Sequence, residues 1–474
     1  MNTSFANTSE EQFKPFTAGP SADRVGREQL DRAAFSKGLQ PASEPPPLTM
    51  ELLRENPEIV ARAAIAKGSD VDLTAVLNAD SAGRAALIAC EQKRREANEC
   101  AQAAQRILAA SGKDSDAFRE IRERGAKIKE EITELSKRSQ QYAADRDEKF
   151  SWIPNLHAPE VPLGGAGANL VLRQTELPAF DFTPRDHVAI GSAQGWLDFE
   201  GGARVAGRGF YFLKGELYLL RQTIALLMLS NLASQGFVPA TTPVFAGRAT
   251  LFGTGYLPWA QKDNFVVNDG SGLAAIGTSE QPLLGQFLDC IVPERKLPIL
   301  LAADTQCFRT EISSGGADAQ GMKRVHQFGK VEQIIICKPE ETRYWHERAL
   351  ANEEDLLRFL EIPHRTVLLS TGDMGFAGYK KYDTEAWLPA KREFMELTSN
   401  TNFRDFQARR LKLRYRGEAS GKNEFPHTIS ATGFSDRLLI AFLENHQQPD
   451  GTVRIPEKLQ AYFGGRSSIG RPIS

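Results

Sequence analysis

The sequence predicts an α+β protein in which a long antiparallel coiled-coil arm precedes a domain built on an antiparallel β-sheet. Two observations predict this fold class. Apolar and small residues recur at alternating spacings of three and four through residues 87–142, with a glycine-containing break near residue 112. Short β-branched runs then cluster in the second half of the chain without regular alternation of strand and helix, which is typical of an antiparallel sheet.

Length and composition exclude several classes of protein. A chain of 474 residues is long enough for about two or three domains. The net charge of -2 provides no overall basic field, so contact with nucleic acid requires a local patch. The five cysteines form no CxxC pair, which argues against a disulfide framework and a structural zinc site. No run approaches the roughly 18 apolar residues of a membrane span, so we expect a soluble, cytoplasmic protein without a membrane partner.

Residues 1–49 form a flexible N-terminal extension according to their composition. They are rich in Ser, Thr, Ala, Gly and Pro, end in Pro45-Pro46-Pro47 and show little apolar periodicity. They contain no apolar core of a secretory signal, and acidic residues such as Glu10 and Asp23 argue against a transit peptide.

The arm, residues 50–150, is predicted to contain two long helices that fold back on each other. The seam of the first helix is expected at Leu87, Cys90, Arg94, Ala97, Ala101, Ala104 and Leu108. The seam of the second is expected at Phe118, Ile121, Gly125, Ile128, Ile132, Leu135, Ser139 and Tyr142. The break at residues 111–114 separates them, and each helix would be on the order of 40 Å long at 1.5 Å per residue. A hairpin of that length projects from a globular domain.

The charged residues of the arm allow two interpretations. Lysines and arginines alternate with glutamates along both helices, which is typical of a solvated, salt-bridged surface. A subset of the cations would alternatively follow a phosphate backbone. Composition alone favours the first interpretation.

The rest of the chain is predicted to be one mixed domain after a Pro- and Gly-rich linker at residues 151–170. Residues 221–237 have the pattern of an amphipathic helix that ends at Gly236. Residues 333–337 and 366–370 are short β-branched runs typical of buried strands. Neither a GxxxxGK[ST] loop nor a GxGxxG loop after a strand is present, so any nucleotide is bound without these two glycine loops.

One stretch, residues 308–332, places charged strand ends on both sides of a glycine-rich loop. A hairpin with Arg309 and Glu311 on one strand and Phe328 on the other can hold a nucleotide. The arginine would meet a phosphate through charge-assisted hydrogen bonds, and the ring would stack on the base. Charged hairpins are more often ordinary surface, so this pattern alone leaves both interpretations open.

The same stretch resembles motif 2 of the class II aminoacyl-tRNA synthetases, and in detail that of the seryl-tRNA synthetase family. The matching segments are FRTE (308–311), GMKRVHQF (321–328) and KVE (330–332). GFVPATTPVF resembles motif 1, with Pro243 as its proline, and HTISATGFSDR resembles motif 3. The resemblance extends from about Met50 to Gly465, which makes residues 151–465 the catalytic domain and residues 466–474 a C-terminal tail.

The resemblance implies a fold and a reaction. The fold is a class II synthetase antiparallel sheet of six to seven strands with flanking helices, in a homodimer closed through motif 1. The reaction is that of a serine–tRNA ligase: ATP and serine give seryl adenylate and pyrophosphate, and the seryl group passes to serine tRNA. Such chemistry depends on positioning and on cations around the phosphates. The helical arm would bind the serine tRNA.

The resemblance also implies roles in ATP binding and catalysis. Arg309 would grip the α-phosphate and the serine carboxylate, Glu311 would read the adenine amino group, and Phe328 would stack on the ring. Arg324 and Arg437 would meet the outer phosphates. The catalytic set is Arg309, Glu311 and Arg437. The residues expected to bind ATP are Arg309, Glu311, Arg324, Val325, Phe328, Glu396, Ser399 and Arg437.

The metal and serine sites follow from the same resemblance. Glu396 and Ser399 match the family's pair of Mg²⁺ ligands, and oxygen ligands suit that hard ion. The residues expected to bind serine are Thr278, Glu280, Arg309, Glu332 and Thr432. A carboxylate there would pair with the ammonium group, and a hydroxyl would read the substrate hydroxyl. Such a site rejects alanine because its own polar groups would be left unpaired.

The chain departs from the family pattern in motif 3 and in the GTSEQPL segment (277–283). Ser430 stands where the family usually has asparagine, and Gly277 stands where it usually has proline. Four residues separate Thr432 from Arg437 where the family normally has five, and the unexpected acid Asp436 precedes the arginine. We expect Arg437 to face the ATP site nevertheless, with Thr432 beside Glu332, the shortening absorbed within residues 433–435, and Asp436 acting as a helix cap or first-turn acid.

Three hypotheses follow from the sequence. The first is a working seryl-tRNA synthetase, either divergent or a second copy. The second is a paralogue that activates serine or an analogue for natural-product assembly or self-protection. The third is a tRNA-binding or dimer-forming paralogue with little catalysis. The intact ATP residues argue against the third hypothesis, and the sequence does not separate the first two.

Overall fold

The computed structural model describes residues 44–310 and 321–473, and these residues form two compact units. One unit comprises residues 48–154, and the other comprises residues 44–47 and 155–473. Most of the expected N-terminal extension and Glu311 therefore lie outside the described residues. Leu48 and Thr49, which were assigned to the extension, belong to the helical unit: Leu48 is buried, and the Thr49 hydroxyl accepts a hydrogen bond from the Leu52 N–H at 3.1 Å.

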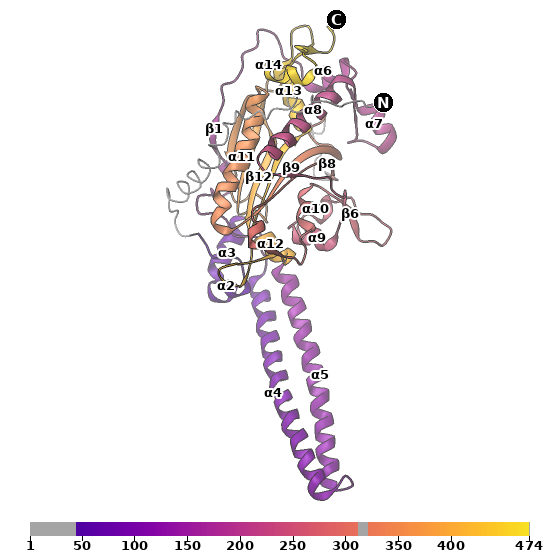
Figure 1. Ribbon diagram of the computed structural model, residues 1–474, viewed down its shortest axis with the longest axis vertical. Coiled ribbons are helices and arrows are strands. Elements are labelled where there is room, and N and C mark those ends of the chain that lie inside the picture. The colour runs from indigo at the N-terminus through magenta and orange to yellow at the C-terminus, as the bar shows by residue number, and fades with distance from the viewer. Residues whose placement is uncertain (1–43, 311–320, 474) are drawn as a thin grey trace, which may run out of the picture. The chain divides into compact units, whose positions relative to one another are not determined.

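The first unit consists of helices, as predicted. They are α2 (Met50–Glu55), α3 (Pro57–Ala66), α4 (Leu73–Ser111) and α5 (Asp116–Phe150). The two long helices α4 and α5 form an antiparallel hairpin (Figure 1). Asp72 and Ser115 are their N-caps, and Gly112 ends α4 with a positive φ of 76°. These local signals place the turn where the sequence predicted it.

The seam between α4 and α5 was predicted correctly for α5 and only in part for α4. The α5 positions are all at least partly protected, and Ile128 is buried. On α4, Cys90 lies in the seam, but Leu87 and Leu108 are 48% and 44% exposed. The predicted positions Ala97 and Ala104 are also partly protected. At the four exposed positions, Leu87, Arg94, Ala101 and Leu108, the protected residue lies one position earlier: Ala86, Lys93, Cys100 and Ile107. The prediction failed because a seam of small residues fits either phase of the three–four alternation, and the larger residues of α5 select one of them.

The second unit is built on an eight-stranded sheet. In spatial order its strands are β1 (Leu170–Gln174), β10 (His364–Leu368), β11 (Lys380–Leu388), β12 (Glu393–Arg404), β15 (His427–Ser435), β9 (Gln327–Cys337), β8 (Ile299–Phe308) and β4 (Val238–Pro239). All neighbours are antiparallel except β4 and β8. The expected six to seven strands were too few because short strands add to the edges, and β4 contains only two residues.

The predicted elements of this unit are present with shifted limits. The run at 333–337 is the end of β9, and the run at 366–370 corresponds to β10, which ends at Leu368. The amphipathic helix predicted at residues 221–237 is α8 (Gly215–Ser234). Gly236 follows it with a φ of 93°, a conformation that favours glycine after a helix C-terminus.

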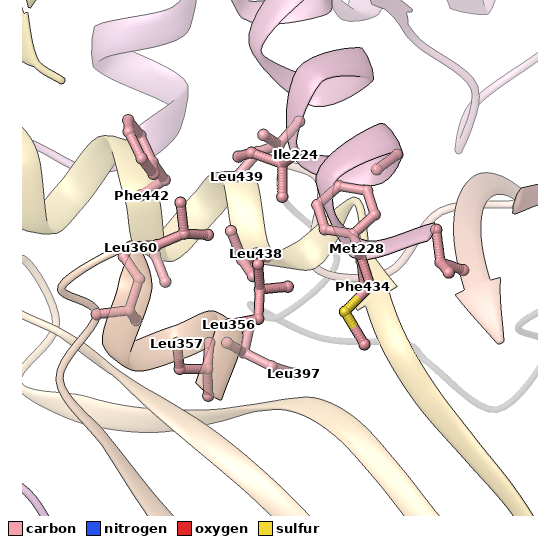
Figure 2. Close-up of a cluster of buried hydrophobic side chains, with 14 of the residues drawn as sticks. Ile224, Met228, Leu356, Leu357, Leu360, Leu397, Phe434, Leu438, Leu439 and Phe442 are labelled. Carbon is pink, nitrogen blue, oxygen red and sulfur yellow. The ribbon is translucent and has the colours of Figure 1, made fainter. Parts of the chain in front are cut away.

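Strand β9 separates two hydrophobic cores because its side chains alternate between the faces of the sheet. Val331 and Ile335 face a core that also contains α8, α11 (Thr342–Phe359) and α13 (Arg437–His446). Figure 2 shows this core, in which Ile224, Met228, Leu356, Phe434 and Leu438 meet. On the other face, Ile334 and Ile336 pack with α10 (Glu280–Gly285) and α12 (Phe406–Leu411). Burial on both faces explains the uninterrupted apolar run.

Short elements surround the sheet. Within the described residues, the remaining α-helices are α6 (His187–Ala193), α7 (Phe199–Ala206), α9 (Arg248–Gly253) and α14 (Glu457–Gln460). The small sheets pair β2 (Leu197–Asp198) with β3 (Phe212–Leu213), β5 (Phe245–Gly247) with β6 (Leu273–Ala275), β7 (Ile291–Pro293) with β13 (Arg414–Arg416) and β14 (Asn423–Glu424), and β16 (Val453–Arg454) with β17 (Ser468–Ile469). The segment assigned to a tail thus supplies β17. The Ile473 N–H also bonds to the Asp450 carbonyl at 2.7 Å, so this segment belongs to the second unit.

All five cysteines are free thiols, in agreement with the prediction of no disulfide framework. In the part of the chain that the structure describes, no helix combines the length and apolar character needed to cross a bilayer. The same residues contain no group of three or more His, Cys, Asp or Glu side chains arranged to hold a metal ion.

Candidate active site

A cavity of about 420 Å³ lies in the second unit, against the face of the sheet that β9, β12 and β15 present. We call it the main cavity. The described segments around it come from three parts of the chain: residues 254–280, Arg309 together with residues 322–332, and residues 374–437. Sheet strands supply its most regular wall, which fixes the spacing of side chains more firmly than loops would.

Strand β9 contributes three side chains through its two-residue period. Phe328, Lys330 and Glu332 point to the same face and line the cavity. The next residues on that face, Ile334 and Ile336, are core residues. One strand therefore carries an aromatic ring, a cation and a carboxylate in a row, followed by an apolar anchor.

Two β-bulges bring pairs of residues three positions apart to the same wall. In a regular strand, Glu396 and Ser399 would face opposite sides of the sheet. On β12 the register shifts opposite Thr384 and Glu385, which leaves Leu397 as the extra residue, and both Glu396 and Ser399 then line the cavity. The shift on β15 leaves out Gly433 in the same way.

The bulge at Gly433 leaves little room for a side chain. A Cβ there would lie 2.8 Å from the Met228 Cε atom, so the buried Met228 side chain of α8 would have to shift to admit it. As a result of the bulge, Thr432 and Ser435 both line the cavity, and Thr432 pairs with Glu332. The expectation that Thr432 lies beside Glu332 is confirmed. The bulge at Gly433 lies within residues 433–435, where the shortening of motif 3 was expected to be absorbed.

One region of the wall is rich in positive charge. Its cations are Arg309, Lys323, Arg324, Lys330, Lys381 and Arg437. The Arg309 Nε atom donates to the Gly277 carbonyl at 3.3 Å, and its guanidinium lies 5.4 Å from the centre of the Phe328 ring. The Arg437 Nε atom donates to the Lys323 carbonyl at 3.1 Å. These contacts fix the direction of both guanidinium groups before any ligand binds.

Glu396 lies among these cations. Its Oε2 atom is 3.4 Å from the Arg437 Nη1 atom, and its side chain is 48% exposed. Desolvation would raise the pKa of Glu396, but the charges of Arg437, Lys381 and Arg309 lower it overall. Glu396 and Ser399 thus place a charged carboxylate and a hydroxyl on the same wall. Mg²⁺ is commonly bound by one or two such oxygen ligands together with substrate phosphates, so this donor set fits the ion.

A second region of the wall holds two buried carboxyl groups. The Glu332 carboxylate accepts hydrogen bonds from the Ser430 hydroxyl at 2.7 Å and the Thr278 hydroxyl at 3.2 Å, and it forms an ion pair with Lys330. The Gln407 amide donates to the Glu280 Oε1 atom at 2.6 Å. Burial and the neighbouring Glu332 raise the pKa of Glu280 to about 7.

Most of the predicted site residues line the main cavity. They are Glu280, Arg309, Arg324, Val325, Phe328, Glu332, Glu396, Ser399, Thr432 and Arg437. Thr278 does not line it, because its side chain is fully buried. Its hydroxyl contacts two residues that do, donating to the Glu332 carboxylate and accepting from the Glu280 N–H, both at 3.2 Å. Glu311 lies outside the described residues.

Sequence reasoning missed several residues of the wall. The main ones are Tyr256, Trp259, Lys330 and Lys381. Lys330 lies in the quoted KVE segment, so the alternation of β9 would have found it. Lys381 lies 3.6 Å from Asp383 on β11 and belongs to no motif, so only the sheet order places it beside Glu396 and Ser399.

Asp436 acts neither as the helix cap nor as the first-turn acid, the two roles that were predicted for it. It occupies the N-cap position of α13, but its side chain makes no capping hydrogen bond. Its φ and ψ of -58° and -20° are helical, which turns the carboxylate away from the first turn. The carboxylate instead contacts Arg221 and the Gly329 N–H.

The antiparallel sheet, motif 2 hairpin and charged cavity define the class of the protein: it is a class II aminoacyl-tRNA synthetase. Residues 265–446 match the family model of the tRNA synthetase class II core domain (G, H, P, S and T). Residues 48–157 match that of the seryl-tRNA synthetase N-terminal domain. The chain belongs to the seryl-tRNA synthetase family, as its similarity to individual members shows.

Two curated relatives illustrate this similarity. The serine–tRNA ligase of Rubrobacter xylanophilus is 38% identical over 428 residues, which cover 89% of this chain and 99% of that protein. The serine–tRNA ligase of Deinococcus radiodurans is 37% identical over 431 residues, covering 90% and 100%.

Solved structures agree with this assignment. The seryl-tRNA synthetase of Pyrococcus horikoshii complexed with ATP superposes with a TM-score of 0.84 at 32% identity, covering 90% of this chain and all of that one. The cytoplasmic serine–tRNA ligase of Naegleria fowleri in complex with AMP gives a TM-score of 0.79 at 27% identity, covering 90% and 99%.

Proposed function

We propose that the protein is a serine–tRNA ligase that uses ATP to activate serine and then transfers the seryl group to serine tRNA. One observation carries the proposal: a single cavity joins a cation-rich wall to a buried pair of carboxyl groups, in a chain of this family. In the first step a serine carboxylate oxygen bonds to the α-phosphorus, and the bond to the bridging oxygen breaks to release pyrophosphate. In the second step a ribose hydroxyl of the tRNA attacks the seryl carbonyl, and AMP leaves.

ATP would occupy the cation-rich wall. Arg309 would contact the α-phosphate and the attacking carboxylate, where it offsets the negative charge that grows in the transition state. Arg324 and Arg437 would contact the outer phosphates, and Phe328 would stack on adenine. Glu311, which lies outside the described residues, would bind the adenine amino group.

Mg²⁺ would be held by Glu396 and Ser399, and it would supply charge neutralisation for the phosphates. The support for this proposal is the donor set itself, which the bulge at Leu397 brings to one wall. Arg437, 3.4 Å from Glu396, contributes positive charge beside the same carboxylate.

Serine would occupy the region of Glu280, Glu332 and Thr432. The carboxyl groups there suit an ammonium group, and Arg309 lines the same cavity, where it would contact the serine carboxylate. Thr278 would act through Glu332, which it contacts at 3.2 Å. Serine would be favoured over alanine because the buried polar groups lose a partner when the substrate hydroxyl is absent.

The arm would bind the tRNA. Arg122 and Lys127 are exposed on α5, and neither forms an ion pair within the described residues. Lys93 and Arg119 lie on the same hairpin but pair with acidic side chains, Lys93 at 2.8 and 2.9 Å and Arg119 at 2.7 Å. Unpaired cations are the ones available to phosphates.

These two pairs of residues test the arm's role. We expect Arg122→Ala/Lys127→Ala to raise the KM for tRNA and to reduce the salt dependence of charging, since each phosphate contact adds about 0.7–0.9 to the slope of log K against log salt. Lys93→Ala/Arg119→Ala is the matched control and should change both much less. If both double variants changed the KM for tRNA and the salt dependence equally, Arg122 and Lys127 would have no special role in binding tRNA. They would then be ordinary solvent-exposed charges of the arm.

The active form would be a homodimer. Helix α8 exposes apolar side chains, with Tyr218 45%, Leu219 55% and Leu226 46% accessible. Leu219→Asp/Leu226→Asp should therefore yield monomers in analytical ultracentrifugation. A dimer of unchanged stability would remove α8 from the interface.

ATP–pyrophosphate exchange with serine, alanine, threonine and cysteine, followed by charging of serine tRNA, tests the central proposal. Serine should drive exchange, and the other amino acids should do so weakly. Thr432→Val keeps the shape of the threonine side chain and removes its hydroxyl. It should therefore raise the KM for serine more than the KM for ATP. Absence of serine-dependent exchange under conditions that support ATP binding would overturn the proposed function.

A further inference from the structure

Three charged side chains from separate elements meet beside the main cavity. Arg221 of α8 donates from Nε to the Asp436 Oδ1 atom at 2.9 Å. Its two terminal nitrogens donate to Asp304 of β8 at 2.6 and 2.7 Å. Arg221 and Asp436 are 4% and 6% exposed. We call these three residues the acid–arginine–acid group.

Asp436 connects this group to strand β9. Its Oδ2 atom accepts a hydrogen bond from the Gly329 N–H at 2.6 Å, and its own N–H donates to the Gly329 carbonyl at 3.0 Å. The two bonds extend the β9–β15 pairing by one residue beyond Lys330 and Ser435. Asp436 thereby joins the start of α13 to β9.

The neighbours of these two residues are both expected ATP ligands. Arg437 follows Asp436, and Phe328 precedes Gly329, so each lies one peptide bond from the connection. Both line the main cavity, as does Asp436 itself. A change in the Asp436–Gly329 contact must therefore alter the relative placement of a guanidinium and an aromatic ring.

The surroundings leave Asp436 little freedom. A Cβ at position 329 would lie 2.0 Å from the Arg221 Nη2 atom, so only glycine lets the guanidinium reach the carboxylate. The Tyr211 hydroxyl lies 3.3 Å from the Asp436 Oδ2 atom. The Arg221 guanidinium also lies 5.4 Å from the centre of the Phe434 ring, which holds it from the core side.

The charges require one another. Burial raises the pKa of Asp436, and the positive charge of Arg221 opposes this effect. Arg221 in turn is buried between two carboxylates, and Asp304 is the more exposed of them, with 27% of its side chain accessible. Removing one member leaves an imperfectly balanced buried charge on the others.

We propose that Asp436 is a positioning residue for ATP binding, which acts by holding Arg437 and Phe328 in register and is itself held by Arg221 and Asp304. The inference rests on the proposed use of ATP. It explains how a motif 3 with four residues between Thr432 and Arg437 still directs the arginine into the cavity. It also makes the geometry of the ATP wall depend on α8 and β8.

Asp436→Asn in the full-length protein is the first test, because asparagine keeps the shape and removes the charge. The KM for ATP in pyrophosphate exchange should rise on the order of tenfold, as expected for a lost charge-assisted hydrogen bond. The KM for serine should stay within about twofold, because Glu280 and Glu332 are held by other contacts. Equal rises in both KM values would overturn the proposal in favour of a merely structural role.

A double-mutant cycle with Arg437→Ala separates positioning from direct contact. If Asp436 acts through Arg437, Asp436→Asn should add little to the loss of ATP affinity that Arg437→Ala already causes. Independent, additive losses would overturn the proposal. Titration calorimetry with ATP alone measures this affinity, and it does not require serine activation. If the wild-type protein bound ATP but did not activate serine, the proposed function would be wrong, and the role of Asp436 in ATP binding could still be tested.

Glu354→Gln is the matched control. Glu354 is also a buried acid, held by the Arg173 Nε atom at 2.5 Å, but it does not line the main cavity. Glu354→Gln should lower the melting temperature without raising the KM for ATP more than the KM for serine. Should Asp436→Asn fail to fold, Asp304→Asn replaces it, with a smaller selective rise in the Kd for ATP expected and no such rise contradicting the proposal.

Discussion

Replacing Arg309 by alanine removes the cation that we place on the reacting phosphate. The side chain is half-buried, it lines the main cavity, and its direction is set by the Gly277 carbonyl at 3.3 Å and the Phe328 ring at 5.4 Å. A guanidinium held in this way before the substrate arrives needs little reorganisation when charge develops on the α-phosphate. We therefore expect the variant to lose activity mainly in the chemical step.

Two magnitudes decide how the loss divides between kcat and KM. Removing one preorganised donor to a developing negative charge costs about 3–4 kcal/mol, which corresponds to a kcat lower by roughly 10²–10³-fold. Losing the contact with Phe328 costs about 0.5–1 kcal/mol, which raises the KM for ATP only about two- to fivefold. Arg309→Lys keeps the positive charge but loses the planar, bidentate guanidinium, so its kcat should lie between those of wild type and Arg309→Ala.

The assay is serine-dependent ATP–pyrophosphate exchange, with melting temperature recorded for each variant. Arg365→Ala is a matched control, because Arg365 also lies on a phenylalanine ring, 4.2 Å from the centre of Phe394, and its Nε atom also donates a hydrogen bond, here to Glu385. It does not line the main cavity and should keep near-normal exchange. A kcat for Arg309→Ala within about threefold of wild type would refute the role assigned to Arg309.

Three further predictions concern other parts of the protein. Replacing residues 84–141 by a short glycine–serine linker should leave pyrophosphate exchange measurable and reduce tRNA charging to background, because no residue of the arm lines the main cavity; charging without the arm would contradict this. Ser430→Ala removes the donor at 2.7 Å from Glu332 and should raise the KM for serine roughly 10–100-fold, while Ser370→Ala, a buried serine bonded to the Gly165 carbonyl, should not. Because the pKa of Glu280 is raised to about 7 and an ammonium ligand favours its charged form, serine binding should release a proton and tighten as pH rises through about 7. Calorimetry in buffers of different ionisation enthalpy measures the release, and an unchanged pH dependence in Glu280→Gln would exclude Glu280 as its source.

The sequence by itself determined the arm, the class of the second unit and most side chains of the site. Helix caps and a glycine break are local signals, so Asp72, Gly112 and Ser115 placed the two helices correctly. The resemblance of the quoted motifs to the family predicted Arg309, Phe328 and Glu332 as site residues, and all three line the cavity. For Phe328 and Glu332 the two-residue period of strand β9 gives the physical reason, because it places both on one face of the sheet.

Only the tertiary structure decided what depends on contacts between distant segments. The phase of the α4 seam is set by the larger side chains of α5, and the shared wall position of Glu396 and Ser399 depends on a bulge in the β11–β12 pairing. Asp436 was predicted as a cap or first-turn acid from its position before a helix. Its carboxylate instead accepts a hydrogen bond from Arg221, which lies 215 positions away in the sequence. A local rule describes the preferences of a free helix end, and a buried ion pair of that kind overrides them.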